Sequence, residues 1–230
     1  MKITFLGTGT SMGVPMIACA CDVCQSSDPH DKRTRSSVKI DTPDHTVVID
    51  SGPDFRHQML ASETRHLDAI LFTHEHKDHT AGLDDVRAFN WINEQPTLLY
   101  GENRLLEALK QEFSYAFKSE EEKYPGVPEL ILHEISDTDS FPVCDLHVTP
   151  VRVFHHQMPV LGFRIGHFSY VTDASRIPPE SMAKLKNSDV LVINGLRIEE
   201  HISHFNLDQA LSVIEDLAPE RAYITHISHH

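Results

Sequence analysis

The chain of 230 residues is 40% hydrophobic, which is enough to bury the core of one compact domain. Acidic residues outnumber basic ones by 34 to 20, and the net charge of −14, with His neutral, opposes an extended nucleic-acid-binding surface. No apolar stretch approaches the roughly 20 residues of a membrane span, and the start MKITFLGTGTSMG turns to Gly and Thr too early for a signal peptide. We therefore expect a cytoplasmic protein without a membrane partner, whose phosphate substrate, if it has one, is bound locally.

Short runs of β-branched and aromatic residues, bounded by turn residues, predict a chain dominated by strands. In chain order the predicted strands are Ile3–Leu6, Ser37–Ile40, Thr46–Ile49, Ala69–Phe72, Thr97–Tyr100, Leu130–Ile135, Leu146–Phe154, Gly162–Ile165, Ser169–Thr172, Val190–Ile193 and Ala222–Thr225. No internal repeat, low-complexity tract or change in composition marks a linker. The sequence therefore predicts a single domain over residues 1–230.

Two helices are predicted from a capping residue followed by an apolar stripe. Asn103 is expected to cap the first, whose stripe consists of Leu105, Leu109, Phe113 and Phe117. Asn206, with Gln209 three residues later, has the pattern of a capping box, and its stripe consists of Leu207, Leu211, Ile214 and Leu217. The acidic, turn-forming stretch of residues 119–128 is expected to be a solvated surface loop rather than a lid.

The stretch FTHEHKDHTAG, residues 72–82, crowds titratable side chains directly after an apolar run. His74 and His76, two residues apart in an extended segment, project the same way and can bind one ion, while Asp78 and His79 can bind a neighbouring one. Neutral imidazole and carboxylate suit Zn, Mn or Fe, and the lack of thiolates argues against a purely structural zinc here. One motif therefore serves two metals.

Acids and histidines also follow several predicted strands at their carboxyl ends. These residues are Asp50, His74, His155, Asp173 and His226. A lone His is more often a satisfied core or surface residue than a ligand, but chance would scatter these side chains over strand faces and loops alike. Their shared position predicts a site gathered at one edge of the sheets, with Asp173 as the natural bridging carboxylate.

Three of the four cysteines, Cys19, Cys21 and Cys24, form a cluster. In a reducing compartment such a cluster indicates metal binding before a disulfide, and three thiols would leave one unpaired. Cys144 stands alone and is interpreted as a small buried hydrophobe. The glycines Gly7, Gly9 and Gly13 have the spacing G-x-G-x-x-x-G without a following helix, so they predict a turn rather than a dinucleotide site.

The segment HEHKDH resembles the H-x-H-x-D-H signature of the metallo-β-lactamase fold, and the strand-end residues occur in the order in which that superfamily supplies its site. The resemblance implies an α/β fold, an αββα four-layer sandwich covering the whole chain. It also implies one metal bound by His74, His76 and His155, a second bound by Asp78, His79 and His226, and Asp173 between them. Asp50 would brace the histidine loop without touching metal. His156 follows His155, and His155 is preferred because it keeps the family's distance to Leu161, Gly162 and Phe163.

The opening LGTGTSMGVPMIACACDVC and the ending THISHH are similar to the phosphodiesterase branch typified by phosphoribosyl 1,2-cyclic phosphate phosphodiesterase. That branch carries a structural zinc, for which Cys19, Cys21 and Cys24 would supply thiolates and His229 the fourth ligand. Relatives usually continue beyond this motif, so we expect either a truncated sequence or a missing last edge of the fold. A tag origin of His229 and His230 would remove the fourth ligand.

His204, in HISHFNLDQA, lies where relatives, including the tRNA 3′-processing endonucleases, place a histidine that donates a proton or grips phosphate. A histidine near its reference pKa suits that task at neutral pH. The alternative interpretation of His204 is an exposed loop histidine without a catalytic role. His201 is a weaker candidate for the same role. Asp78 and His204 are therefore the expected catalytic residues.

We expect a hydrolase with two divalent metals, Zn or Mn, in its active site and one structural Zn. Its substrate would be a small or cyclic phosphodiester, attacked by a hydroxide that bridges metals about 3.5 to 4 Å apart. A tRNA 3′-end nuclease is the second hypothesis, disfavoured by the net charge of −14 and the absence of a long basic insertion. A non-catalytic metal-binding sensor or scaffold is the third, and a homodimer is left open.

Overall fold

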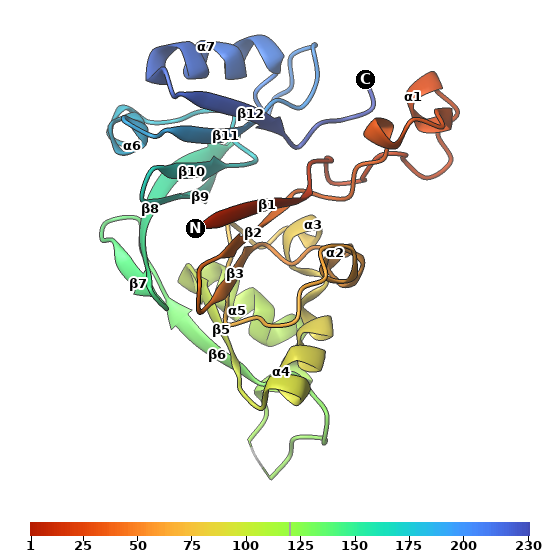
Figure 1. Cartoon of the computed structure of the whole chain (residues 1–230), viewed down its shortest axis with the longest axis vertical. Helices are drawn as coiled ribbons and strands as arrows, with labels where there is room; N and C mark the ends of the chain where they lie inside the picture. The colour runs from red at the N-terminus through yellow and green to blue at the C-terminus, as the bar shows by residue number, and fades with distance from the viewer. Residues whose placement is uncertain (120) are drawn as a thin grey trace. The chain divides into compact units, whose positions relative to one another are not determined.

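The computed structural model describes residues 1–119 and 121–230 and divides the chain into two compact units. Unit 1 consists of Met1–Leu6 and Ser37–Ser136, and unit 2 of Gly7–Ser36 and Asp137–His230. Each unit is built on one six-stranded sheet with its own helices (Figure 1). The predicted α/β class is confirmed. That the two units form a single domain stays a prediction.

Unit 1 contains a sheet in the order β1-β2-β3-β4-β5-β6. Its strands are β1 (Lys2–Gly7), β2 (Ser37–Asp41), β3 (Thr46–Ile49), β4 (Ala69–Leu71), β5 (Thr97–Gly101) and β6 (Leu130–Glu134). β2 and β3 pair antiparallel, whereas β3 to β6 pair in parallel, with Ile49 opposite Leu71. The carboxyl ends of β3 and β4 therefore lie side by side and position the residues that follow them.

The helices of unit 1 are α2 (Phe55–Ala61), α3 (Lys77–Thr80), α4 (Arg87–Asn93) and α5 (Asn103–Glu112), with the 3-10 turns η2 (Leu83–Val86) and η3 (Ser114–Phe117). Of these, α2 and α5 bury apolar side chains in the core of the unit. Phe55, Phe72 and Leu109 belong to one buried cluster between helices and strands. The predicted helix at α5 is confirmed, but the predicted cap is wrong, because Glu102 occupies the N-cap position without a side-chain cap bond.

Unit 2 contains a sheet in the order β12-β11-β10-β9-β8-β7. Its strands are β7 (Phe141–Val143), β8 (Leu146–His155), β9 (Met158–Ile165), β10 (Phe168–Val171), β11 (Val190–Asn194) and β12 (Arg221–Thr225). β10, β11 and β12 run parallel, and both β8 and β10 run opposite to β9. The carboxyl ends of β8, β10, β11 and β12 therefore share one edge.

The helices of unit 2 are α1 (Asp22–Gln25), α6 (Pro179–Leu185) and α7 (Leu207–Leu217), with the 3-10 turn η1 (Pro29–Asp31). The predicted capping box is confirmed: Asn206 accepts the Gln209 N–H at 2.9 Å, and Gln209 accepts the Asn206 N–H at 3.0 Å. α7 lies along β11 and β12 (Figure 1), and Val213 and Ile214 pack on a core that includes Leu191 and Ile193.

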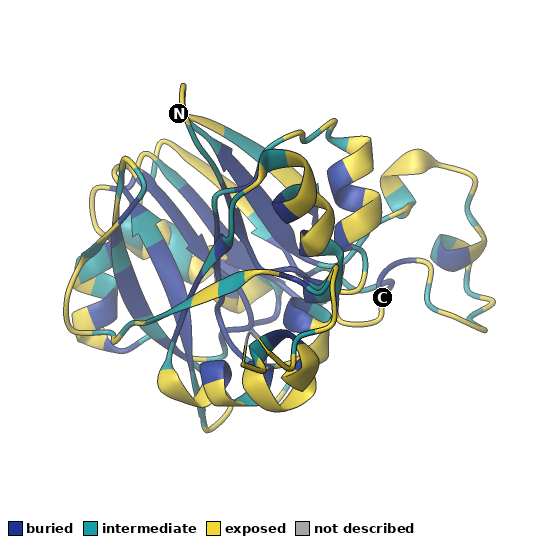
Figure 2. Cartoon of the chain, turned by 90° about the horizontal axis from the view of Figure 1, so that it is seen from below, coloured by how far each residue is buried: buried dark blue, intermediate teal, exposed yellow. Residues whose placement is uncertain are grey.

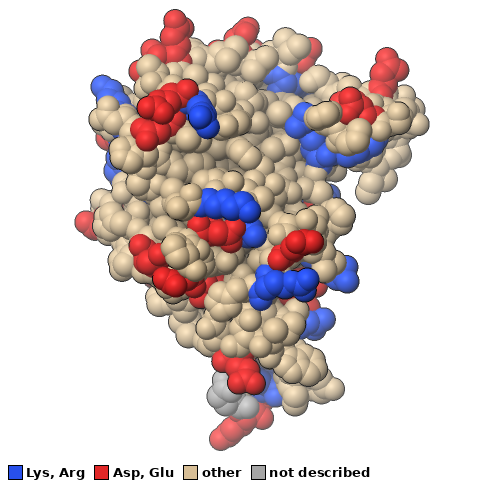
Figure 3. Space-filling view, in the orientation of Figure 1, with Lys and Arg blue, Asp and Glu red and all other residues tan. Residues whose placement is uncertain are grey.

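Burial separates the sheets from their surroundings, because the strands are mostly buried while the helices are buried on one side only (Figure 2). On the face drawn in Figure 3, Lys and Arg side chains are interleaved with Asp and Glu. In the part of the chain that the structure describes, no helix is long and apolar enough to cross a membrane. Ser119 and residues 121–128 form turns or irregular backbone, as predicted, and Glu120 lies outside the described residues.

Candidate metal centre

Asp50, directly after β3, is the centre of the hydrogen-bond network that holds the histidine loop of unit 1. Its buried carboxylate accepts hydrogen bonds from the Thr73 N–H (2.9 Å), the Thr73 hydroxyl (2.9 Å) and His79 Nδ1 (2.7 Å). Burial raises the pKa of the Asp50 carboxyl, while His79 and the hydrogen bonds from Thr73 act to lower it. These contacts place Asp50 behind the loop, in the bracing position that the resemblance implies.

The same network decides which ring nitrogen of His74 and His79 points away from the brace. Because the Thr73 hydroxyl gives its one proton to Asp50, Thr73 Oγ1 accepts from His74 Nδ1, at 3.0 Å. His79 likewise gives its Nδ1 proton to Asp50. The neutral rings therefore carry their lone pairs on Nε2, as metal-binding histidines do when a second group holds Nδ1.

The loop brings its predicted ligands within a few ångströms of one another. The ring centroid of His74 lies 4.6 Å from that of His76 and 4.2 Å from that of His79. His79 Nε2 lies 3.1 Å from a carboxylate oxygen of Asp78. An imidazole nitrogen and a carboxylate oxygen placed in this way can bind one divalent metal together.

Two glycines allow the histidine loop to lie against the backbone that follows β3. A Cβ on Gly52 would lie 2.0 Å from the Asp78 carbonyl oxygen, and one on Gly82 would lie 2.1 Å from the Gly52 carbonyl oxygen. The backbone bond from the Ser51 N–H to the His79 carbonyl, 2.8 Å, closes this contact. The loop geometry therefore depends on residues that carry no metal-binding group.

In unit 2 the candidate residues gather at the shared carboxyl edge of the sheet. His155 ends β8, Asp173 follows β10 after Thr172, and His226 follows β12 directly. His226 Nδ1 lies 3.2 Å from Asp173 Oδ1, and the Thr172 hydroxyl donates to the same oxygen at 2.6 Å. Ligand atoms of His155, Asp173 and His204 all lie within 4.8 Å of one another.

The strand-end residues Asp50, Asp173 and His226 share an unusual backbone conformation. Their φ angles are 63°, 57° and 57°, in the left-handed region that non-glycine residues rarely occupy. Such a conformation turns the chain sharply where each strand ends. Residues held there commonly belong to functional sites, where the surrounding structure maintains the strain.

The structure distinguishes His155 from its neighbour His156. His155 Nδ1 donates to the Ser203 carbonyl at 2.8 Å, which leaves Nε2 as the nitrogen that carries the lone pair of the neutral ring. Its ring centroid lies 4.5 Å from that of His204. His156 is exposed in the turn between β8 and β9, and its N–H donates to the Ser175 hydroxyl. This placement agrees with the choice of His155 as the ligand.

His204 lies among the candidate ligands of unit 2, but not in the electrostatic state that the sequence suggested. It is buried, its ring stacks on His226 at 4.8 Å, and Asp173 lies 3.9 Å from its Nδ1. Desolvation by burial lowers the pKa of His204 to about 3, although Asp173 acts in the opposite direction. The expectation of a histidine near its reference pKa is therefore wrong, because the site removes the ring from water.

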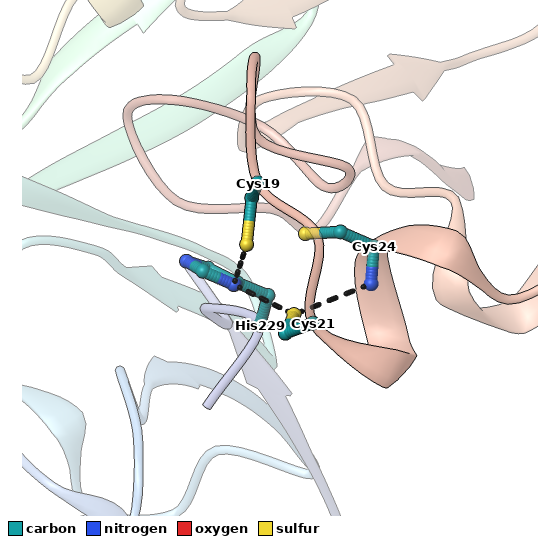
Figure 4. Close-up of side chains that lie close together, drawn as sticks. All are labelled: Cys19, Cys21, Cys24 and His229. Carbon is teal, nitrogen blue, oxygen red and sulfur yellow. Dashed lines mark hydrogen bonds between the residues drawn. The ribbon is translucent and has the colours of Figure 1, made fainter.

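The cysteine cluster of unit 2 forms a separate candidate metal site (Figure 4). Cys19 Sγ and Cys21 Sγ lie 3.4 Å and 3.3 Å from His229 Nδ1, and Cys24 joins them with all four ligand atoms within 4.8 Å of one another. The Met16 N–H donates to Cys24 Sγ, and the Cys24 N–H donates to Cys21 Sγ. The hydrogen bond with His229 is the main cause that lowers the pKa of the Cys21 thiol to about 6. Three sulfurs and one imidazole nitrogen match a closed zinc site.

Comparison with known proteins gives the family. The sequence pattern described as "Beta-lactamase superfamily domain" matches residues 45–227, most of the chain. The chain belongs to the metallo-β-lactamase superfamily. Its relatives in this superfamily are typically metal-dependent hydrolases, and the donor set described above fits divalent metals.

Individual relatives of this superfamily member differ in name. The chain is 42% identical to a protein named octanoyltransferase of Porphyromonas gingivalis over 232 residues, which cover 100% of this chain and 46% of that protein. It is 31% identical to ribonuclease Z of an Exiguobacterium species, over 72% of this chain and 48% of that protein. The chain therefore spans about half the length of these two relatives.

A solved structure described as a new diphosphatase from the PhnP family superimposes with a TM-score of 0.91. It is 39% identical, and the match covers 99% of this chain and 86% of that chain. The metallo-β-lactamase fold expected from the H-x-H-x-D-H segment is thereby confirmed.

Several supporting residues escaped the sequence analysis because they carry no ligand chemistry of their own. Thr73 relays the hydrogen bonds around Asp50, and Gly52 admits the histidine loop. Asn194, at the end of β11, accepts the Ala174 N–H at 2.7 Å and donates to the Ala174 carbonyl at 2.9 Å, which secures the residue after Asp173. Asn194 does follow an apolar strand, so the strand-end pattern used for the acids and histidines could have found it.

Proposed function

We propose that the protein is a dinuclear-metal-dependent phosphodiesterase that acts on a small or cyclic phosphodiester. The observation that carries this proposal is that three imidazole rings are each held by Nδ1, so that the lone pair of the neutral ring is on Nε2. His74, His79 and His155 each have Nδ1 held by a hydroxyl, carboxylate or carbonyl group of their own unit. Histidines held in this way are preorganised as metal ligands, whereas scattered structural histidines have no reason to share the arrangement.

The assignment of ligands follows the resemblance. One metal would be held by His74, His76 and His155 and the second by Asp78, His79 and His226, with Asp173 shared between them. Bound divalent metals supply Lewis-acid polarisation of the phosphoryl group and an activated water. Asp50 keeps the loop ligands in their tautomers, and Asn194 fixes the segment that carries Asp173. The physiological metal, Zn or Mn, is part of the proposal.

His204 is proposed to contact the phosphoryl group. Its Nδ1 is buried and has no hydrogen-bond partner among the described residues. A neutral imidazole carries one N–H, with which it can donate to a phosphoryl oxygen or protonate a leaving group. The burial of the ring favours the hydrogen-bonding role, and the two roles are separated by the leaving-group test given in the Discussion.

A phosphorus ester is favoured over other ester classes by the relatives. The PhnP-family structure, 39% identical, is described as a diphosphatase, and ribonuclease Z acts on RNA. The tRNA 3′-end nuclease remains the second candidate, opposed by the net charge of −14. Octanoyl transfer is not proposed, because the chain matches only 46% of the protein with that name and the gathered residues are of the types that bind metals.

The cysteine cluster is proposed to hold a structural zinc through Cys19, Cys21, Cys24 and His229. A closed site with three thiolates exchanges its metal more slowly than an open site of imidazoles and carboxylates. The protein should therefore contain three metals per chain, of which one resists mild chelation. Metal analysis that finds no zinc retained after this treatment would contradict the assignment.

The experiment that tests the activity is metal analysis combined with a substrate panel. Aryl phosphodiesters, cyclic phosphates, diphosphates, a tRNA precursor, thioesters and lactams should be offered to protein supplied with Zn or Mn. We expect hydrolysis of the small phosphodiesters, and Asp173→Ala should abolish it. Metal-loaded protein that is inert on every ester class would favour the sensor hypothesis, and preference for the tRNA precursor would favour the nuclease.

A further inference from the structure

Helix α5 is anchored in unit 1 by its apolar side. Its buried residues Leu105, Leu106 and Leu109 belong to the core cluster between the helices and the sheet. Movement of the helix would expose these side chains to water, so the packing holds α5 in one position. Polar side chains elsewhere on α5 are therefore fixed points to which a neighbouring loop can be attached.

Both residues that alternate with the predicted ligands in HEHKDH are paired with α5. Glu75 Oε1 lies 3.0 Å from Arg104 Nε, in the first turn of the helix. Lys77 Nζ donates to Glu112 Oε2, at the last residue of the helix. The histidine loop is thus connected to both ends of one anchored helix through side chains of opposite charge.

A third contact lies farther along the same two segments. The Tyr115 hydroxyl, in η3, donates to Asp84 Oδ1, in η2, at 2.5 Å. Burial and this hydrogen bond raise the pKa of Tyr115 to about 12, so the phenol keeps its proton at neutral pH. Residues 75, 77 and 84 therefore meet residues 104, 112 and 115 in the same order, and the segment that carries the histidine loop lies along α5 and η3.

Glu75 depends strongly on its partner, because its carboxylate is only partly exposed. The side chain is 24% exposed, and Oε2 is buried without a hydrogen-bond partner among the described residues. A carboxylate in this position is costly unless a cation compensates its charge, and Arg104 provides that cation. Without Arg104 the Glu75 carboxylate would turn toward water, and the backbone between His74 and His76 would move with it.

We propose that α5 positions the histidine loop, with Arg104 and Glu112 as positioning residues, and that the helix thereby sets the affinity of the loop for metal. Asp50 holds ligand rings, whereas α5 holds the residues between the ligands. Metal–ligand distances tolerate only about 0.2 Å of variation, so a small displacement of the loop backbone lowers metal affinity. This inference rests on the metal-binding part of the proposed function and adds residues that contact no metal.

Titration with Co²⁺ tests the positioning, because the visible absorption of bound Co²⁺ reports coordination geometry as well as occupancy. The full chain is used, with its chelation-resistant metal left in place. Arg104→Ala and Glu112→Ala should each lower the Co²⁺ affinity about 10-fold, as the loss of a supporting residue around a metal site does, and should alter the absorption spectrum. The midpoint of urea unfolding should change little, because partly exposed ion pairs contribute little to stability.

Lys110 and Glu107 provide the matched controls, because they form an exposed ion pair with each other, at 2.6 Å, within α5. Lys110→Ala and Glu107→Ala should leave the Co²⁺ affinity and spectrum unchanged. Arg104→Lys keeps the cation beside Glu75 and should retain most of the affinity, which decides the case if Arg104→Ala also lowers the urea midpoint. Positioning by α5 is overturned if Arg104→Ala binds Co²⁺ as Lys110→Ala does, or if Arg104→Lys loses as much affinity as Arg104→Ala.

This measurement separates the positioning from the proposed activity, since Co²⁺ binding requires no turnover. A protein whose Co²⁺ affinity depends on Arg104 but that hydrolyses no phosphodiester would contradict the proposed activity and keep the positioning by α5. A protein that hydrolyses phosphodiesters, and whose Arg104→Ala and Glu112→Ala variants bind Co²⁺ normally, would keep the activity and contradict the positioning.

Discussion

The two sets of candidate ligands are supported in different ways. In unit 1 the ligands come from one short loop, and a single carboxylate, Asp50, holds that loop through Thr73 and His79. In unit 2 the ligands come from separate strand ends, and His155 is held by a backbone carbonyl while Asp173 is held by its neighbour Thr172. The hydrogen bonds that hold the loop set therefore converge on one carboxylate, whereas those of the strand-end set are distributed over several residues.

The strongest test of this difference is Asp50→Ala. The change leaves the Thr73 N–H and His79 Nδ1 buried without their acceptor, so we expect unfolding to become easier by about 3 to 5 kcal/mol. Metal affinity should also fall, by about 10- to 100-fold, because the tautomers of His74 and His79 lose their support. Urea unfolding followed by circular dichroism, and metal titration, measure the two effects.

Asp44→Ala, which removes an exposed carboxylate of unit 1, is the control and should change neither quantity measurably. If Asp50→Ala were no more destabilising than Asp44→Ala, the dependence of the loop on one brace would be refuted.

The neighbouring histidines of unit 2 give the next largest effect. His155→Ala should lower metal affinity by about 100-fold or more and reduce hydrolysis accordingly, because the ring held by Ser203 would be lost. His156→Ala should leave both unchanged, since that ring is exposed. Metal content after dialysis and kcat/KM on an aryl phosphodiester provide the comparison. Equal losses in the two variants would contradict the choice of His155 over His156 as the metal ligand.

His204→Ala should have a smaller effect, about 10-fold or more on kcat/KM, with metal content unchanged. If the buried, neutral ring donates a hydrogen bond to the phosphoryl group, substrates with good and poor leaving groups should lose activity by similar factors. A general acid would instead produce a loss of about 100-fold or more that is confined to poor leaving groups. Nitrophenyl and alkyl esters of one phosphate distinguish these outcomes in a single variant.

The smallest effect is expected outside both sets, at the pair of Asp137 and Arg152. A hydrogen bond from Arg152 lowers the pKa of the Asp137 carboxyl, so the pair stabilises the folded chain above the unfolded pKa of about 3.9. That contribution is lost as the pH falls through the lower folded pKa. Asp137→Asn should therefore cost about 0.2 to 1 kcal/mol at pH 7, as measured by urea unfolding, and the cost should shrink as the pH is lowered below about 3.9. A cost that does not change with pH would assign the effect to packing.

The same difference between local and distributed support decides what the sequence could predict. The histidine loop was visible because its ligands occur in six consecutive positions, and the capping box of α7 was visible because Asn206 and Gln209 contact each other within one turn. Each predicted strand is present, although β9 begins earlier, at Met158. Local patterns of this kind depend on a few neighbouring residues, so the sequence predicts them without knowledge of the fold.

Elements that depend on distant contacts were missed. β7, Phe141–Val143, contains Pro142 and exists because β8 supplies its hydrogen-bonding partner. α4, Arg87–Asn93, carries the exposed residues Trp91 and Ile92, so its sequence lacks the one-sided apolar stripe that predicts a helix. The pKa of His204 was likewise mispredicted, because it is set by burial among residues far away in the sequence.

The left-handed backbone at Asp50, Asp173 and His226 bears on protein engineering. Glycine adopts this conformation without steric penalty, so replacing a strained residue can relieve strain even as it removes a side chain. Selection for thermal tolerance alone, applied to a mutant library without an activity screen, would accept such replacements at Asp173 and His226. Stabilisation campaigns on this scaffold should therefore exclude these positions from randomisation, since the gain in stability would come at the expense of the proposed metal centre.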